Sequence, residues 1–210
     1  MSGRAYPPDD LRSLSAVQLD ALREVANIGA GHAATALSQM TDQRIMISVP
    51  ELSISPLDAI PNQIEAPEEP VAAVLMKMEG DLTGLTLLVF PKPIALRIAG
   101  LMMRRPVTEL GPIEESAIKE AGNILSAAYL NALADFMNMT LLPSPPSLAI
   151  DMSDAILTST YVESAHGSTY VVCVESEFQL QDADERLRGF FLLLPDPASL
   201  RAILKAIRVA

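Results

Sequence analysis

Cysteine, histidine and tryptophan are scarce in this sequence of 210 residues, which has one Cys, two His and no Trp. The single cysteine, Cys173, excludes an internal disulfide framework and any zinc site built from several cysteines. His32 and His166 are too few for a His-rich metal centre. We therefore expect the chain to hold no cofactor and no metal ion of its own.

Positive charge is in the minority: 15 Lys and Arg against 26 Asp and Glu give a net charge of −11. A nucleic-acid-binding protein would show a basic stripe, and an anionic membrane would repel so acidic a chain. Apolar runs fall far short of the roughly 20 residues that cross a bilayer, and the N-terminus has no apolar signal-peptide core. We expect a cytoplasmic protein that neither inserts into membranes nor binds nucleic acid and whose partner has a basic patch.

Apolar residues, by contrast, make up 50% of the chain, which is enough for a folded core. Their spacing predicts two long and two short helices. These helices cover about 16–40, 93–104, 112–139 and 197–208. Ser15 and Gln18 form a capping-box pattern at the start of the first helix. Gly29 and Gly31 lie inside that helix, where each costs about 1 kcal/mol against Ala, so another element is expected to pack closely against both.

Alternating and β-branched stretches predict the strands. They are Gln43–Val49, Val71–Glu79, Leu82–Phe90, Ile156–Ser164, Thr169–Phe178 and Gly189–Leu194. Residues 55–70 hold four prolines and are interpreted as a loop that can contain a short helical turn. The acidic stretch Asp182–Glu185 is interpreted as the tip of the last hairpin, and residues 1–14 as a flexible, poorly ordered lead-in.

The two halves of the chain follow the same plan. Each has a long helix, strands, a hairpin and a strand that ends in Pro-x-Pro before a short helix, as in Phe90–Pro93 and Leu194–Pro197. Two αβββα units, at about 15–105 and 110–208, would form a single α+β domain over 1–210 with pseudo-two-fold symmetry. We expect an antiparallel sheet packed with the two long helices.

The repetition extends to polar residues, because four positions of the first half recur 96 residues later. They are Asp20, Glu24, Asn27 and Pro50, matched by Ser116, Glu120, Asn123 and Pro146. Hydrophobic periodicity alone would not recreate Glu and Asn at matched places. The three helical positions are i, i+4 and i+7, so they share one face, with Glu and Asn as direct neighbours. Each long helix thus places a carboxylate beside a carboxamide.

This pattern, Asp/Ser-x3-Glu-x2-Asn-x22-Pro, resembles that of the CheC-type phosphatases of bacterial and archaeal chemotaxis. The sequence fits it twice, from Asp20 to Pro50 and from Ser116 to Pro146, and the stretch Asn27–Ala34 is also similar to this family. The resemblance is closest to the CheC type, because CheX-type members keep one site and FliY-type members carry a further domain. It implies a phosphatase that hydrolyses the aspartyl phosphate of a CheY-type response regulator.

The resemblance and the side-chain chemistry together suggest roles. An acyl phosphate is already reactive, so hydrolysis mainly needs a water placed in line with the phosphorus. A carboxamide offers both a donor and an acceptor, so Asn27 and Asn123 are assigned to orienting that water. Glu24 and Glu120 are expected to pair with a lysine of the regulator. The regulator would also supply Mg²⁺ and the phosphorylated Asp.

Asp20 and Ser116 are expected to support these sites, and Pro50 and Pro146 to shape the backbone beside them. Three alternatives stay open. In the first, only one of the two sites is active. The fold can bind phosphorylated regulator, or a CheD-type deamidase, without turnover. The chain can also be a structural component of the flagellar switch.

Overall fold

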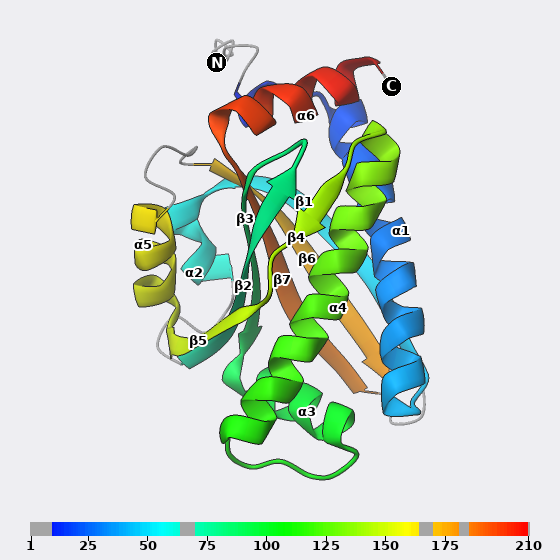
Figure 1. The fold of residues 1–210 in the computed structure, drawn as a ribbon, viewed down its shortest axis with the longest axis vertical. Helices are drawn as coiled ribbons and strands as arrows, with labels where there is room; N and C mark the ends of the chain where they lie inside the picture. Colours follow the sequence, from blue (N-terminus) through cyan, green and yellow to red (C-terminus); the bar gives the residue numbers. More distant parts are fainter. Residues whose placement is uncertain (1–9, 64–69, 164–169, 181–184, 210) are drawn as a thin grey trace.

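In the computed structural model, which describes residues 10–63, 70–163, 170–180 and 185–209, seven strands form an antiparallel sheet with helices on both faces (Figure 1). The strands are β1 Ile45–Pro56, β2 Pro70–Gly80, β3 Gly84–Pro91, β4 Leu141–Pro143, β5 Ser147–Met152, β6 Tyr170–Leu180 and β7 Glu185–Pro195. The helices are α1 Ala16–Thr41, α2 Ile60–Gln63, α3 Lys92–Met103, α4 Pro112–Met137, α5 Ser153–Glu163 and α6 Pro197–Val209.

The sheet has pseudo-two-fold symmetry about its central β3–β7 pair. The strand order is β1-β6-β7-β3-β2-β4, with β5 also paired to β2. β1 of the first half therefore joins the β6–β7 hairpin of the second half, while β4 and β5 of the second half join β2 of the first. Each half thus completes its sheet with a strand of the other. The predicted α+β fold with a repeated αβββα unit and an antiparallel sheet is confirmed.

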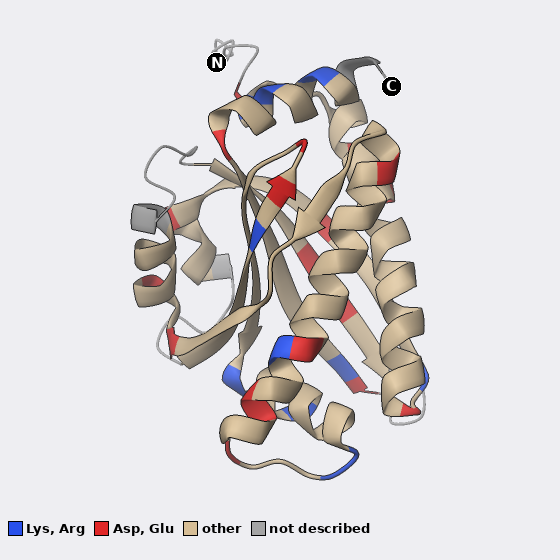
Figure 2. Ribbon diagram, in the orientation of Figure 1, with Lys and Arg blue, Asp and Glu red and all other residues tan. Residues whose placement is uncertain are grey.

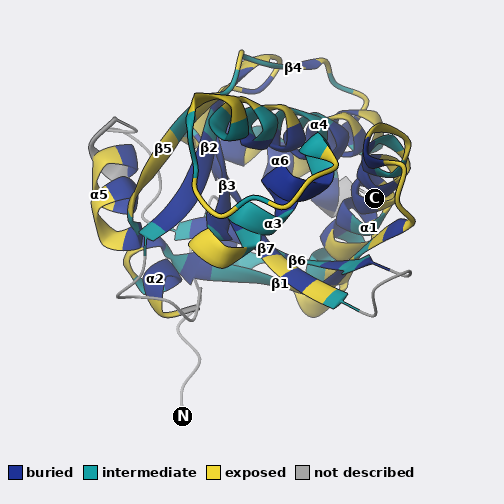
Figure 3. Cartoon of the chain, turned by 90° about the horizontal axis from the view of Figure 1, so that it is seen from below, coloured by how far each residue is buried: buried dark blue, intermediate teal, exposed yellow. Residues whose placement is uncertain are grey.

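Helices cover the two faces of the sheet unequally, and the strands alternate accordingly. The larger core joins the sheet to α1, α3, α4 and α6, and includes Val74, Leu88 and Val174. The smaller core lies on the other face with α2 and α5, and includes Ala73 and Leu87. Both faces of the central strands are buried (Figure 3). Consecutive apolar residues therefore follow one another in them, as in Leu87–Phe90 of β3 and Phe190–Leu194 of β7.

The two long helices begin and end as their local sequence dictates. The Ser15 hydroxyl accepts from the N–H of Gln18 and the Gln18 side chain accepts from the N–H of Ser15, so the predicted capping box is confirmed. Both helices end at a residue in the left-handed conformation, Asp42 after α1 and Asn138 after α4. These caps also lie 96 residues apart, so the repeat includes the helix ends. None of the helices in the described part of the chain is long and apolar enough to cross a membrane.

One prediction about the second half was wrong. Ile156–Ser164, predicted as a strand, falls largely within α5. Ile156 and Leu157 pack there against the smaller core, and Thr160, one turn later, is also buried, so the β-branched Ile156 and Thr160 were misleading. The strand of that repeat lies earlier, as β4 and β5. In the first half, the short helical turn allowed for within residues 55–70 is present, as a 3-10 turn at Leu57–Ala59 followed by α2. The segment also contains the end of β1, which was not predicted.

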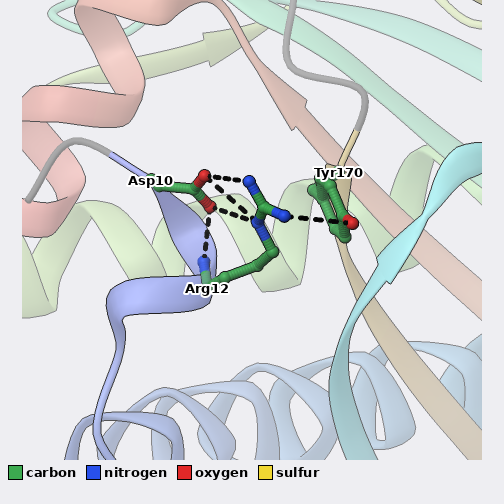
Figure 4. Close-up of polar contacts among 3 residues, drawn as sticks. All are labelled: Asp10, Arg12 and Tyr170. Carbon is green, nitrogen blue, oxygen red and sulfur yellow. Dashed lines mark hydrogen bonds and ion pairs between the residues drawn. The ribbon is translucent and has the colours of Figure 1, made fainter. Parts of the chain in front are cut away.

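The lead-in is more structured than predicted from Asp10 onward. Leu11, in a short 3-10 helix, is buried with 1% of its surface exposed. The Arg12 guanidinium stacks 4.3 Å from the centre of the Tyr170 ring and bonds to the Asp10 carboxylate (Figure 4). Residues 1–9 and most of the predicted hairpin tip, 182–184, lie outside the described residues.

Candidate functional site

The motif residues lie on α1 and α4, which pack side by side and run antiparallel (Figure 1). On α1, Asp20 and Glu24 are exposed and Asn27 is half-buried. On α4 the matching residues have the same burial: Ser116 and Glu120 are exposed and Asn123 is half-buried. Each copy therefore places an accessible Glu next to a partly enclosed Asn. The two copies are on different helices and form two separate sites.

The carboxamide of Asn27 is fixed by the neighbouring strand. Its Oδ1 accepts a hydrogen bond from the backbone N–H of Val49 at 3.1 Å. β1 changes register between Ser48 and Glu51, where it contains Pro50, which has no N–H for the ladder. The irregular backbone leaves the Val49 N–H to the side chain. The fixed spacing from Asn27 to Pro50 is therefore the length of chain that brings this irregular part of β1 back beside the Asn27 side chain.

The second copy has the same spacing but not the same bond. Pro145 occupies the position that matches Val49, and proline has no N–H to donate to Asn123. At this point the strand is interrupted between β4 and β5. Ser144, between β4 and β5, hydrogen-bonds to Lys77 of β2. Its N–H donates to the Lys77 carbonyl, and its Oγ accepts from the Lys77 N–H, both at 2.9 Å.

Asp20 and Ser116, expected to support the sites, make contacts within their own helices. The Asp20 carboxylate lies 3.5 Å from the Arg23 guanidinium, on the exposed surface. The Ser116 hydroxyl donates to the Pro112 carbonyl one turn earlier, at 2.9 Å. These contacts explain how two chemically different residues can occupy the same place in the pattern.

Gly29, two positions after Asn27 on α1, sets the approach of the two long helices. A Cβ atom at Gly29 would lie 3.0 Å from backbone atoms of Ala128 and Tyr129 on α4. The Tyr129 hydroxyl in turn hydrogen-bonds the Ser176 hydroxyl of β6 at 2.6 Å, and burial raises the pKa of Tyr129 to about 12. The expectation of close packing was wrong for Gly31, where a Cβ would meet nothing within 4 Å.

Charge is concentrated in the first half of each long helix. After Glu24, α1 has no Asp, Glu, Lys or Arg before it ends at Thr41. After Glu120, α4 has none until Asp135. Figure 2 shows the corresponding uncharged stretches of α4 in tan. Glu24 and Glu120 are thus the last charged residues before a long uncharged stretch of each helix.

Among the residues that the structure describes, no three His, Cys, Asp or Glu side chains lie close enough together to hold a metal ion.

Sequence reasoning found the motif residues but missed Val49, whose backbone N–H contacts Asn27. The fixed spacing to Pro50 was the only signal, and it was interpreted as backbone shaping. It also missed two exposed apolar residues at the start of the long helices, Val17 and Ile113, which have 77% and 67% of their surface exposed.

Comparisons with known proteins agree with the repeated pattern. A model of the CheC-like family matches residues 17–54 and 113–150, two segments that contain the two copies of the motif. The chain is 32% identical to the CheY-P phosphatase CheC of Bacillus subtilis over 195 residues, covering 90% of this chain and 93% of that protein. It is 29% identical to the flagellar motor switch phosphatase FliY of the same organism over 145 residues, covering 67% of this chain and 38% of that protein.

A solved structure shows the same fold. Thermotoga maritima FliY superposes on this chain with a TM-score of 0.76 and 24% sequence identity, covering 93% of this chain and 98% of that one.

Proposed function

The chain belongs to the CheC-like family, and we propose on that basis that it is a phosphatase that hydrolyses the aspartyl phosphate of a CheY-type response regulator in chemotaxis. The observation that carries this proposal is the accessible Glu beside a half-buried Asn, present once on α1 and once on α4. Both helices pack on one face of the sheet, and their outer sides are open to a folded partner (Figure 1).

In the proposed reaction, the carboxamides of Asn27 and Asn123 orient the water that attacks the phosphorus. A carboxamide oxygen has two lone pairs, so Asn27 Oδ1 can accept from the Val49 N–H and from a water at the same time. A water that donates one proton to this oxygen keeps a lone pair for the phosphorus. Phosphoryl transfer depends mainly on such positioning, which is worth up to roughly 7–11 kcal/mol.

The proposed role of Glu24 and Glu120 is to pair with a lysine of the regulator. A carboxylate acting directly on the phosphoryl group would be repelled by it, whereas an exposed carboxylate one turn from the Asn can bind a cation beside the phosphate. The regulator supplies Mg²⁺ and the phosphorylated Asp in this scheme. The chain contributes the orienting amide and the anchoring charge.

The decay of the organism's own CheY-type regulator, phosphorylated with acetyl phosphate, tests the proposal. We expect the wild-type protein to accelerate decay, Asn27→Ala and Asn123→Ala each to remove part of the acceleration, and the double variant to remove all of it. Asn62→Ala changes an exposed Asn of α2, on the opposite face of the sheet, and serves as the control.

Three results would contradict the proposal. A double variant as active as the wild type would exclude the Asn residues from the reaction. Slower decay with the wild-type protein, together with a stable complex, would identify a binding module for the regulator. Capture of a CheD-type deamidase without turnover would point to that protein as the partner instead.

A further inference from the structure

Exposed apolar residues recur with the motif. Val17 and Ile113 are 77% and 67% exposed, the two highest values among the large apolar side chains of the described residues. They lie 96 residues apart, each three positions before the first motif residue of its helix. Ile28, next to Asn27, is also exposed at 56%, and its counterpart Ile124 is partly buried. Isolated exposed apolar residues are common, but these two stand at matched positions on the two helices that carry the duplicated motif.

These residues share a helix face with the site glutamates. Val17, Glu24 and Ile28 are spaced i, i+7 and i+11, which places them within a narrow sector of α1. At 1.5 Å per residue the row from Val17 to Ile28 is about 16 Å long. Ile113, Glu120 and Ile124 form the same row on α4. We call these the α1 row and the α4 row.

We propose that the α1 row and the α4 row are docking surfaces for two copies of the same response regulator, with Val17 and Ile113 as the main apolar anchors. This inference rests on the proposed function, because it assigns the surface around each site to the substrate protein. The matching surface of the regulator combines an apolar patch with a cation: the patch covers Val17 or Ile113, and the cation meets Glu24 or Glu120.

The duplication itself argues for one partner that binds twice. The exposed apolar residue, the carboxylate and the carboxamide keep their spacing on both helices, so a partner that fits the α1 row also fits the α4 row. The uncharged helix surface beyond each Glu imposes no further charge requirement on that partner.

Charge argues against a second copy of this chain as the occupant. Contact between two α1 rows would bring Glu24 and Asp20 of one copy toward the same residues of the other, and the chain has a net charge of −11. A regulator with a basic residue beside its phosphorylation site removes this repulsion. Electrostatic complementarity of this kind mainly sets specificity and association rate, while the apolar anchor contributes to affinity.

Variants in single-site backgrounds test each row separately. With the second site disabled by Asn123→Ala, we expect Val17→Ser to raise KM for the phosphorylated regulator by about tenfold, as when an apolar anchor is withdrawn from an interface, and to leave kcat unchanged. With the first site disabled by Asn27→Ala, Ile113→Ser should do the same. Val and Ser have similar helix propensities and Val17 is exposed, so the fold is retained.

Matched controls come from the opposite face of the sheet. Met46 and Leu142 also lie 96 residues apart and are exposed at 53% and 58%. Their neighbours Ile45 and Leu141 belong to the larger core, on the face of the sheet that the long helices cover. Because successive side chains of a strand point to opposite faces, Met46 and Leu142 point away from the long helices. We expect Met46→Ser and Leu142→Ser to leave KM unchanged. Titration with beryllofluoride-activated regulator should show two sites per wild-type chain and weaker binding at the site changed by Val17→Ser or Ile113→Ser.

The two proposals fail differently. A wild-type protein that binds the activated regulator but does not hydrolyse its phosphate would contradict the proposed function alone. Active single-site variants whose KM and binding are unaffected by Val17→Ser and Ile113→Ser would overturn the docking surfaces alone. A change in oligomeric state without a change in KM would assign the rows to contacts between copies of this chain, and would also overturn the inference.

Discussion

The carboxamide oxygen of Asn27 accepts a hydrogen bond from the backbone N–H of Val49, 22 residues further along the chain, at 3.1 Å. Because an N–H can only donate, the atom that meets it is the oxygen, and the orientation of this amide is therefore defined. Asn123 has no such donor at the matched position, where Pro145 stands. The two copies of the motif share their residues but differ in how the strand holds the asparagine.

This difference predicts unequal effects on stability. Asn27→Ala leaves the Val49 N–H without its acceptor, so we expect the free energy of unfolding to fall by about 1 kcal/mol more than with Asn123→Ala. Urea denaturation of the two variants measures this. Asn27→Asp keeps an acceptor for the N–H and should recover most of the loss. Equal losses in Asn27→Ala and Asn123→Ala would contradict the assignment of this bond.

The two glycines of α1 offer a second comparison. Gly29→Ala places a methyl group 3.0 Å from the α4 backbone, and we expect the overpacking to outweigh the better helix propensity and to lower the free energy of unfolding by about 1 kcal/mol. Gly31→Ala meets open space and should raise it by about 0.5–1 kcal/mol. Thermal or urea denaturation distinguishes the two. If both variants were more stable than the wild type, α1 and α4 would have to lie further apart at Gly29 than they do in this structure.

The long helices, the repeat and the motif could be predicted from sequence because each depends on local spacing. Helical periodicity defines α1 and α4, the Ser15 cap fixes where α1 starts, and the 96-residue offset identifies the equivalent residues. The offset also extends from helix to strand, since β1 and the β4–β5 stretch begin and end 96 residues apart. Local rules suffice where the chain itself sets the geometry.

What could not be predicted depends on contacts between distant segments. Thr160 and its neighbours suit either a strand or a helix, and only packing on the smaller core decides for α5. Gly29 and Gly31 look alike in sequence, yet only Gly29 lies against α4. The bond between Asn27 and Val49 likewise exists only when β1 lies along α1.

The only cysteine should be unreactive in the folded protein. Cys173 is buried in β6 among apolar neighbours, and burial, together with nearby Glu175 and Glu51, raises the pKa of its thiol to about 12. Because the thiolate is the reactive form, we expect negligible labelling by a disulfide reagent at pH 8 and one equivalent after unfolding in urea. Rapid labelling of the native protein would show that β6 opens or that the thiol is accessible.

The two Pro-x-Pro turns differ in one residue, and the difference predicts a pH effect. Asp196 caps α6: its carboxylate accepts from the Ser199 N–H at 2.8 Å and from the Thr83 hydroxyl. Burial raises the pKa of Asp196, but the hydrogen bonds from Ser199, Thr83 and Ala198 outweigh this effect and hold the pKa below its usual value. The folded state thus favours the ionised form, and this stabilisation is present above about pH 4 and lost as the pH falls through the lowered pKa.

Asp196→Ala should therefore lower the free energy of unfolding by about 1 kcal/mol at pH 7, the usual cost of a lost helix cap. Urea denaturation between pH 7 and pH 2 should show the variant and the wild type converging as the carboxylate is protonated. The matching residue of the first half is Lys92, the first residue of α3, and the start of that helix has no side-chain cap. Lys92→Ala should therefore change stability by less than about 0.5 kcal/mol at every pH. A gap between Asp196→Ala and wild type that persists at low pH would mean that the cap stabilises α6 through its shape and not through its charge.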